Sequence, residues 1–308
     1  MKALQDKIRR LKKERNAVIL AHFYTRPEVQ EVADFLGDSL ALSQKACKME
    51  APVILFAGVN FMAETAKVLA PEKTILVPNP EAGCSLADSC NAEEFRRYLT
   101  LHPCHTVVSY VNTTVEVKAL TDVCCTSSNA IKVVESIDKR IPVLFGPDHN
   151  LGRFVMKRAN RDNILLWQGG CHVHERFRLE AIEELRKLHP SAEVMVHPEC
   201  RPEVQDAAHF VGSTSDIIDY CRRSSQREFI IVTEAGILAT LRREMPDKEF
   251  IPVPSSDGSP LNECEYMKMV TLESIARCLE EMSPAVTIDE EVRKAAERSI
   301  VSMVNIGR

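Results

Sequence analysis

Short runs of apolar, often β-branched residues recur along the chain and are bounded by Gly, Pro and Asn, which is typical of buried strands. Eleven such runs lie at 17–23, 52–58, 73–78, 105–111, 122–127, 141–146, 163–168, 192–198, 208–213, 228–234 and 248–254. Stretches with helical periodicity separate them. Because continuous apolar strands that alternate with helices form parallel sheets covered on both faces, we expect an α/β fold.

Helices are expected at both ends of the chain. Leu4, Ile8 and Leu11 form an apolar stripe at helical spacing, which predicts a surface helix. The tail from about 284 predicts a closing helix. Thr287 can cap it, and the acidic residues at 289–291 would stabilise the N-terminal end of its dipole.

The strand pattern belongs to an internal repeat. Two sets of polar residues recur at intervals of 88 and then 87 residues: His22, Tyr110 and His197, and Ser39, Ser127 and Thr214. Three cysteines also recur, Cys84, Cys171 and Cys264, at intervals of 87 and 93 residues. A long period shared by independent positions predicts three copies of one folded unit. We expect three similar αβα units, each a doubly wound, parallel four-stranded sheet, around a pseudo-threefold axis.

We expect these units to comprise residues 1–102, 103–189 and 190–272. A C-terminal helical tail, 273–308, would pack back on the body. In sheets of this kind, ligands bind beyond the carboxyl ends of the strands. The recurrent polar residues lie at those ends, so the pattern predicts one cavity to which all three units contribute.

Composition and charge limit the functions that this chain can have. It has 308 residues, of which 45% are hydrophobic and 27% charged, which indicates a folded protein. A net charge of −5 argues against nucleic-acid binding, which requires clustered basic residues. No apolar stretch approaches the roughly 20 residues of a membrane span, and no apolar run follows the basic N-terminus as in a signal peptide. We expect a cytoplasmic protein with neither nucleic-acid nor membrane partners.

The three recurrent cysteines have the features of a shared inorganic site. Cys84, Cys171 and Cys264 each follow the last strand of a unit by a short loop and precede a helical pattern. A helix N-terminus favours the thiolate, which binds metals. Gly83 and the glycines at 169–170 would let the loops approach a bulky group. Three thiolates this far apart in sequence suit a 4Fe–4S cluster whose fourth iron stays open as a Lewis acid.

Other interpretations of the cysteines stay open. The three could be unrelated buried thiols, which the matched register disfavours, or could hold one zinc ion with His172 or His174 as fourth ligand. Cys200 falls out of register with the ligand positions, and Cys90 has no counterpart, so neither is expected to be a ligand. Six more cysteines are expected to be small buried hydrophobes: Cys47, Cys104, Cys124, Cys125, Cys221 and Cys278.

A ring of polar residues is expected around the same centre. Residues two apart at a strand end point the same way. This rule pairs His22 with Tyr24, Tyr110 with Asn112, and His197 with Glu199. Hydroxyls and helix N-termini at Ser39, Ser127, Ser213 and Thr214 suit carboxylates or a phosphate.

Five further residues are less clearly assigned. His174 lies one helical turn after Cys171 and is expected beside the cofactor. Met62, Glu64 and Asp148 could serve either the site or packing between units. Lys268 is expected to be a solvated or dipole-facing helix residue.

Eleven short motifs follow one another along the chain: AHFY, GDSL, GVNFMAETAK, AGCSLAD, SYVNT, TSSNA, GPDHNLG, GGCHVHE, VHPEC, VGST and CEYMK. In this order they make the chain resemble, nearly from end to end, the quinolinate synthase family, the A protein of bacterial NAD biosynthesis. Two features depart from the family. Leu86 stands where many members carry Met, and the closely spaced cysteine pairs that some members carry near the C-terminus are missing.

The resemblance implies three αβα units around a central 4Fe–4S cluster. It implies an enzyme that condenses iminoaspartate with dihydroxyacetone phosphate to give quinolinate, phosphate and water, with iminoaspartate supplied by an L-aspartate oxidase or dehydrogenase. Cys84, Cys171 and Cys264 would be the cluster ligands. The substrate contacts would be His22, Ser39, Tyr110, Asn112, Ser127, His197, Glu199 and Thr214. The catalytic residues would be Tyr24, His174, His197 and Glu199.

Two other functions remain open at this point. Diphthamide-type radical enzymes also take one cysteine from each of three similar domains to hold a cluster that cleaves S-adenosylmethionine. A non-catalytic iron–sulfur sensor is the second alternative, although no basic face suggests a nucleic acid as its output partner. The polar ring suits a small anionic ligand better than a protein substrate.

Overall fold

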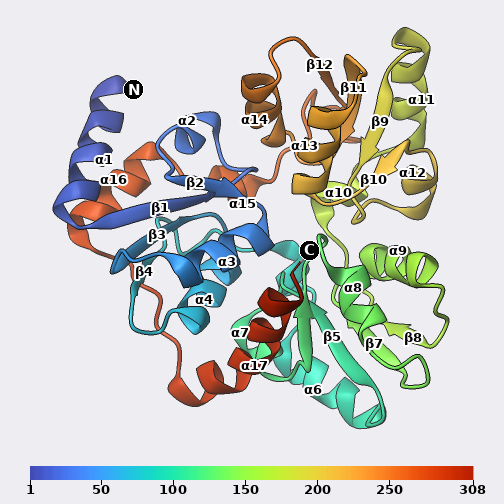
Figure 1. Cartoon of the computed structure of the whole chain (residues 1–308), viewed down its shortest axis with the longest axis horizontal. Helices are drawn as coiled ribbons and strands as arrows, with labels where there is room; N and C mark the ends of the chain where they lie inside the picture. Colours follow the sequence, from blue (N-terminus) through green and yellow to red (C-terminus); the bar gives the residue numbers. More distant parts are fainter. Residues whose placement is uncertain (308) are drawn as a thin grey trace.

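The computed structural model describes residues 1–307 and contains three parallel four-stranded sheets (Figure 1). The first has the order β2-β1-β3-β4 and consists of β1 (Ala17–His22), β2 (Phe35–Gly37), β3 (Val53–Ala57) and β4 (Thr74–Leu76). The second has the order β6-β5-β7-β8 and consists of β5 (Thr106–Tyr110), β6 (Val123–Cys125), β7 (Val143–Gly146) and β8 (Ile164–Leu166). The third has the order β10-β9-β11-β12 and consists of β9 (Glu193–Val196), β10 (Phe210–Val211), β11 (Glu228–Val232) and β12 (Glu249–Pro252). The identical strand order confirms three similar α/β units.

All eleven predicted strand runs contain a strand, and one strand was missed. The pattern fails at β2, which has only three residues, two of them partly exposed. Its pairing with β1, where His22 lies opposite Gly37, holds it in the sheet. Phe35 and Leu36 are its only apolar residues and neither is β-branched, so the sequence carries no strand signal there and the neighbouring strand determines it.

Helices flank each sheet. Those of the first 102 residues are α1 (Lys2–Glu14), α2 (Pro27–Gln30), α3 (Ser39–Lys48), α4 (Asn60–Leu69), α5 (Ser85–Asp88) and α6 (Ala92–Leu101). The next are α7 (Val115–Ala119), α8 (Ala130–Glu135), α9 (His149–Ala159), α10 (His172–Glu175) and α11 (Leu179–Leu188). The last are α12 (Pro202–Asp206), α13 (Thr214–Arg223), α14 (Ile237–Glu244), α15 (Glu265–Lys268), α16 (Leu272–Glu281) and α17 (Glu290–Ile306).

The two terminal helices differ in how well the sequence predicts them. In α1, Ile8 and Leu11 are buried, as the stripe indicates, and the helix packs on α16 against the first sheet. The predicted cap of the closing helix is wrong. Asp289 caps α17, since its carboxylate accepts hydrogen bonds from the backbone N–H groups of Glu291 and Val292, and Thr287 lies two residues too early.

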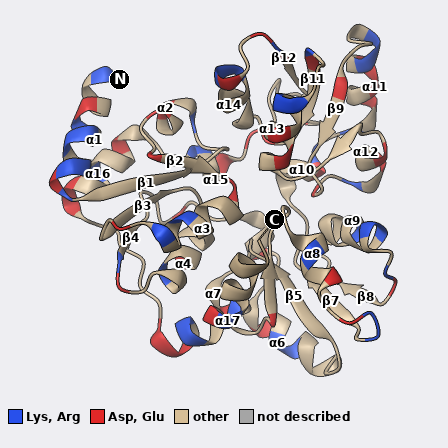
Figure 2. Ribbon diagram, viewed as in Figure 1, with Lys and Arg blue, Asp and Glu red and all other residues tan. Residues whose placement is uncertain are grey.

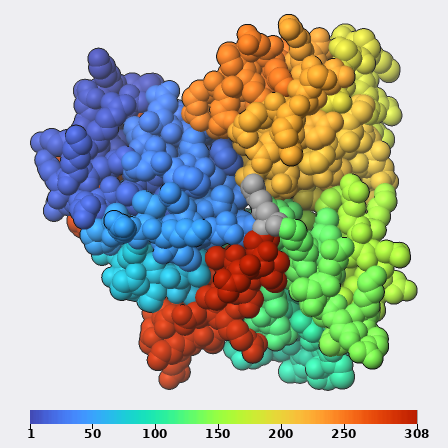
Figure 3. Space-filling view, in the orientation of Figure 1, coloured from blue at the N-terminus to red at the C-terminus, as the bar shows by residue number. Residues whose placement is uncertain are grey.

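The three lobes surround a common centre, and α17 lies across the first and second of them (Figures 1 and 3). Its contacts are with α4, α7 and β6. The largest apolar cluster contains Ile54, Phe145 and Phe229, one buried residue from each sheet. Shared packing therefore fixes the lobes relative to one another. The boundaries 1–102, 103–189, 190–272 and 273–308 stay a prediction.

Candidate active site

The carboxyl ends of the strands from all three sheets open on one cavity, which has about 690 Å³ of empty space when the open solvent at its mouth is included. The residues that the resemblance implied as ligands, substrate contacts or catalytic groups all line it: His22, Tyr24, Ser39, Cys84, Tyr110, Asn112, Ser127, Cys171, His174, His197, Glu199, Thr214 and Cys264. The repeat therefore brings these residues together. Their individual roles stay predictions. Ser213, also expected to offer a hydroxyl, does not line the cavity, because it is buried as the N-cap of α13 and its hydroxyl donates to Asp216 Oδ2.

Two histidines occupy matching places with the same local geometry. His22 ends β1, and His197 follows β9. In each case the backbone N–H two residues later donates to the histidine Nδ1, from Tyr24 at 3.1 Å and from Glu199 at 3.3 Å. An accepting Nδ1 leaves the proton of the neutral ring on Nε2. Burial lowers the pKa of His22 to about 4 and that of His197 to about 3. Both rings are therefore neutral near pH 7.

Glu199 is the centre of a buried polar network. The Tyr110 hydroxyl donates to its Oε1 at 2.5 Å, and His174 Nδ1 lies 2.9 Å from its Oε2. The rings of His174 and His197 stack with their centroids 4.6 Å apart. Burial by itself would raise the pKa of Glu199, but the adjacent His174 and the hydrogen bonds from His174 and Tyr110 lower it overall. Glu199 is therefore held as a carboxylate.

Tyr24 is joined to this network through a threonine that the sequence analysis missed. Its hydroxyl lies 2.7 Å from both Thr214 Oγ1 and Thr233 Oγ1, and Thr233 Oγ1 lies 3.0 Å from His174 Nε2. A continuous chain of hydrogen bonds thus runs from Tyr24 to Glu199. Burial raises the pKa of Tyr24 well above its usual range, so the phenol stays protonated. The sequence does contain one indication of this residue, because Thr233 is the first polar residue after an apolar strand.

Each of the three recurrent cysteines directly precedes a short helix, as predicted. Cys84, Cys171 and Cys264 are the N-cap residues of α5, α10 and α15. The expectation that these thiols lean toward the thiolate is wrong for the metal-free side chains. Burial raises the pKa of Cys84 to about 11 and that of Cys264 to about 12, and it raises that of Cys171 well above its usual value. Desolvation outweighs the backbone N–H donors, so a bound cation is needed to deprotonate them.

The spacing of the three sulfur atoms disfavours a single zinc ion between them. Within residues 1–307, Cys84, Cys171 and Cys264 do not form a set whose sulfurs all lie within 4.8 Å of one another. Tetrahedral zinc would hold its sulfur ligands about 3.8 Å apart. His172, one candidate for the fourth ligand, is engaged elsewhere, because its Nε2 lies 2.8 Å from Glu265 and its Nδ1 contacts Ser85. Three thiols that line one cavity without gathering around a single ion are a donor set suited to a larger inorganic group such as a 4Fe–4S cluster.

A repeated backbone contact supports each cysteine loop. The N–H groups of Asn60, His149 and Ala235 donate at 2.8 to 2.9 Å to the carbonyl oxygens two residues before each cysteine. Those acceptors belong to Ala82, Gly169 and Asn262. The loop positions are therefore fixed by the backbone, which explains how three different loop sequences present their thiols in the same way.

Two of the loops are also held by a buried carboxylate. Asp148 Oδ2 accepts from the Cys171 N–H at 3.3 Å, and Glu234 Oε1 accepts from the Cys264 N–H at 3.0 Å. The matching position in the first unit is Val59. The sequence analysis left open whether Asp148 serves the site or packing between units. The structure shows that it supports the Cys171 loop.

Three other expectations concern residues near these loops. Lys268 is not a solvated residue, because its Nζ lies 2.7 Å from Glu234 Oε1 and only 12% of its side chain is exposed. Glu64 contacts the neighbouring unit, accepting from the Val115 N–H at 3.1 Å. Met62 is buried in the shared core.

The glycines act differently from the expectation. A side chain at Gly169 would meet Ser89 Oγ at 2.2 Å and the Pro147 carbonyl oxygen at 2.7 Å, so this glycine allows protein segments to approach each other. At Gly83 the nearest atom would be 3.6 Å away. Gly83 lines the cavity, whereas Gly169 and Gly170 do not.

The remaining cysteines only partly follow the prediction. Cys90 and Cys200, rejected as ligands, are buried outside the set that lines the cavity. Cys124, Cys125, Cys221 and Cys278 are buried as expected. Cys47 and Cys104 are exposed instead, on the last turn of α3 and in the loop before β5. Helical or apolar neighbours in the sequence do not establish which face a residue occupies.

Figure 2 shows basic and acidic residues interspersed on the outer helices, with no single-sign face in that view. Of the helices in residues 1–307, none combines the length and apolar character that a membrane crossing requires.

Comparison with known proteins identifies the family. The family model described as Quinolinate synthetase A protein matches residues 6–305. A protein of Prochlorococcus marinus named quinolinate synthase is 50% identical over 305 residues, which cover 99% of this chain and 91% of the relative. Proteins of the same name from Trichormus variabilis and Synechococcus sp. are 49% and 50% identical over 96% of this chain and over 91% and 92% of their own lengths. The chain therefore belongs to the quinolinate synthetase A protein family, a family of enzymes.

Proposed function

We propose that this enzyme condenses iminoaspartate with dihydroxyacetone phosphate to give quinolinate, phosphate and water. The observation that carries the proposal is the single cavity in which one cysteine from each sheet lies beside a ring of buried hydrogen-bonding groups. Family membership supports the same reaction.

Cys84, Cys171 and Cys264 would hold a 4Fe–4S cluster. When bound, the cluster would supply an open iron that polarises a substrate oxygen as a Lewis acid. The three thiols support this assignment, because they line one cavity and each follows the last strand of a different sheet.

Neutral donors would bind the anionic substrates. Among the described residues, neither Lys nor Arg lines the cavity. His22 and His197 carry their protons on Nε2 and are neutral, so they can donate hydrogen bonds without adding charge. Ser39 and Thr214 are the first residues of the ten-residue helices α3 and α13, whose N-termini favour carboxylates or a phosphate. Asn112, Ser127 and Tyr110 would complete the contacts.

Proton transfers would use the network around Glu199. The lowered pKa of Glu199 keeps it ionised, so it can accept a proton from a group that becomes strongly acidic during the reaction, and the raised pKa of Tyr24 keeps its phenol protonated, so it can donate a hydrogen bond. His174 lies between Glu199 and Thr233 and would pass protons along the chain that ends at Tyr24. His197, stacked on His174, would orient the substrate beside them.

The substrate chemistry implies an enzyme that oxidises L-aspartate to iminoaspartate, an oxidase or a dehydrogenase, and places this chain in NAD biosynthesis. We place it in the cytoplasm. All eleven cysteines are free thiols in the structure, which supports a reducing compartment.

The test is anaerobic, cluster-reconstituted protein supplied with dihydroxyacetone phosphate and with iminoaspartate generated in the assay. We expect quinolinate and phosphate in equal amounts, and none from Cys84→Ala. Cluster-loaded protein that forms no quinolinate but cleaves S-adenosylmethionine would instead indicate a radical enzyme. A loaded cluster with neither activity would indicate a sensor.

A further inference from the structure

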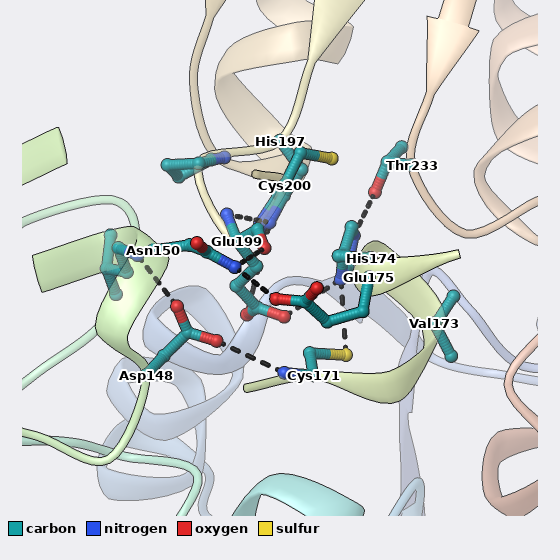
Figure 4. Close-up of polar contacts among 12 residues, drawn as sticks. Asp148, Asn150, Cys171, Val173, His174, Glu175, His197, Glu199, Cys200 and Thr233 are labelled. Atoms are coloured by element: carbon teal, nitrogen blue, oxygen red, sulfur yellow. Dashed lines mark hydrogen bonds and ion pairs between the residues drawn. The ribbon is translucent and has the colours of Figure 1, made fainter. Parts of the chain in front are cut away.

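Three potential metal ligands gather on one side of the cavity. Cys171 Sγ, His174 Nδ1 and a Glu199 carboxylate oxygen all lie within 4.8 Å of one another (Figure 4). His174 Nδ1 is 3.2 Å from Cys171 Sγ and 2.9 Å from Glu199 Oε2. It is the one such group found within residues 1–307, and it shares only Cys171 with the three recurrent cysteines.

Neighbouring groups already orient all three ligands. The Tyr110 hydroxyl donates to Glu199 Oε1, which leaves Oε2 directed at His174. Thr233 Oγ1 contacts His174 Nε2 at 3.0 Å, the contact that fixes a metal-binding histidine with Nδ1 free. The Cys171 N–H is held by Asp148. Such second contacts distinguish a built metal site from a chance cluster of polar side chains.

We propose that the cluster-free chain binds one zinc ion through Cys171 Sγ, His174 Nδ1 and Glu199 Oε2. Zinc takes thiolate, imidazole and carboxylate ligands at about 2.0–2.3 Å, so its tetrahedral ligands lie about 3.3–3.8 Å apart. His174 Nδ1 needs to move only slightly away from Cys171 Sγ and from Glu199 Oε2, which now lie 3.2 and 2.9 Å from it. The Cys171 thiol releases its proton to solvent on binding, and thiolate plus carboxylate then balance the charge of the ion. The fourth position faces the cavity, where a water can bind.

The consequence is competition between two metals for one sulfur. Under the proposed function, Cys171 ligates the cluster, and it cannot also serve zinc. Zinc would moreover occupy Glu199 and His174, which are expected to act on substrate. A chain that has captured zinc is therefore blocked both in cluster loading and in its proton-transfer groups. This competition rests on the proposed function, whereas zinc binding itself does not.

The site is tested with the full-length chain, reduced, metal-free and under anaerobic conditions, by titrating Zn²⁺ against a chromophoric chelator. We expect one high-affinity zinc per chain. Cys171→Ala, His174→Gln and Glu199→Gln should each weaken binding at least about tenfold. Cys84→Ala and Cys264→Ala are the matched controls, because each removes a cavity thiol outside the proposed set, and both should stay within about threefold of the parent chain. Equal weakening by all three cysteine variants would assign the ion to the three thiols and overturn the proposal.

Co²⁺ provides a second readout that does not depend on comparing affinities. We expect a sulfur-to-cobalt charge-transfer band with tetrahedral ligand-field bands, lost in Cys171→Ala and kept in Cys84→Ala. Octahedral spectra without that band would also overturn the proposal.

Circular dichroism of each variant shows whether it folds. Preloading with Zn²⁺ should slow cluster reconstitution several-fold. If zinc binds with the expected variant pattern and the reconstituted enzyme makes no quinolinate, the zinc site stands and the proposed function fails.

Discussion

Lys268 and Glu234 form an ion pair, with Nζ 2.7 Å from Oε1, at the contact between the first and third lobes. Glu234 is fully buried, and the same ammonium group donates to the Tyr24 carbonyl oxygen at 2.7 Å. Glu234 also accepts from the Cys264 N–H. One pair thus connects a predicted cluster ligand to the segment that carries Tyr24.

Breaking this pair should be costly, and removing both members should cost less than the two single changes together. Lys268→Met leaves the buried Glu234 carboxylate without its counterion, so we expect it to lower the free energy of unfolding by about 3 kcal/mol. Glu234→Gln should cost less, because the Lys268 ammonium keeps the half-exposed carboxylate of Glu263 at 3.7 Å. In the Glu234→Gln/Lys268→Met double variant neither charge remains. Denaturant unfolding of the four proteins measures this, and strictly additive losses would contradict the pairing.

Replacing any one of the three cavity cysteines should remove the cluster. We expect Cys84→Ala, Cys171→Ala and Cys264→Ala each to fall from about four irons per chain toward none after anaerobic reconstitution. Cys90→Ala and Cys200→Ala are controls at buried cysteines outside the cavity and should keep full iron and sulfide. A cavity variant with an unchanged iron content and absorption spectrum would remove that residue from the ligand set.

Tyr24 and Glu199 should matter for turnover more than for folding. We expect Tyr24→Phe and Glu199→Gln each to lower kcat by roughly 10²-fold or more at unchanged iron content, because each loses a proton-transfer group. Tyr98→Phe, on the outer helix α6, is a matched control and should keep kcat. Steady-state quinolinate formation provides the measurement. Full turnover in both cavity variants would show that the acid–base assignment is wrong.

Acidification should destabilise the fold through the buried histidines. The pKa of His22 is about 4 in the folded chain, below its ordinary value of 6.5. Between these values the unfolded chain binds a proton that the folded chain does not, so stability falls as pH falls from 6.5 toward 4. Each such histidine contributes a slope of about 1.4 kcal/mol per pH unit. Denaturant unfolding of the cluster-free chain at several pH values should give a shallower slope for His22→Gln. Ser39→Ala, which removes no titrating group, should keep the parent slope, and an unchanged slope in His22→Gln would contradict the account.

Gly169 should not tolerate a side chain, whereas Gly83, which lies in the corresponding cysteine loop of the first unit, should. An added methyl group at Gly169 would meet Ser89 and the Pro147 carbonyl oxygen well inside contact distance. We expect Gly169→Ala to cost about 1–3 kcal/mol of stability. At Gly83 the added methyl group would lie 3.6 Å from the Tyr266 ring, an ordinary contact distance, and Gly83→Ala should change stability by less than 1 kcal/mol. Thermal unfolding compares the two, and equal effects would count against the crowding.

The pattern of apolar residues predicted the strands well but did not predict which individual side chains are buried. Apolar runs predicted the long strands, because a buried strand needs continuous apolar residues whatever surrounds it. The same reasoning failed for β2, whose two apolar residues, Phe35 and Leu36, are not β-branched, and for Cys47 and Cys104, whose exposure depends on packing. Lys268 was misjudged for the same reason. Its sequence neighbours indicate a surface helix, while its partner Glu234 lies 34 positions earlier in the chain.

The sequence by itself determined that three copies of one unit follow one another, and which residues stand at matching strand ends. This was possible because a repeated unit repeats its polar positions at a fixed interval, and parallel strands place those positions at one edge of the sheet. Only the tertiary structure decided how the three edges meet. It joined Tyr24 to Glu199 through Thr233 and His174, and it raised the pKa of the cysteine thiols that helix position alone would lower. Contact and desolvation depend on distances between residues far apart in the chain, and no local pattern encodes those distances.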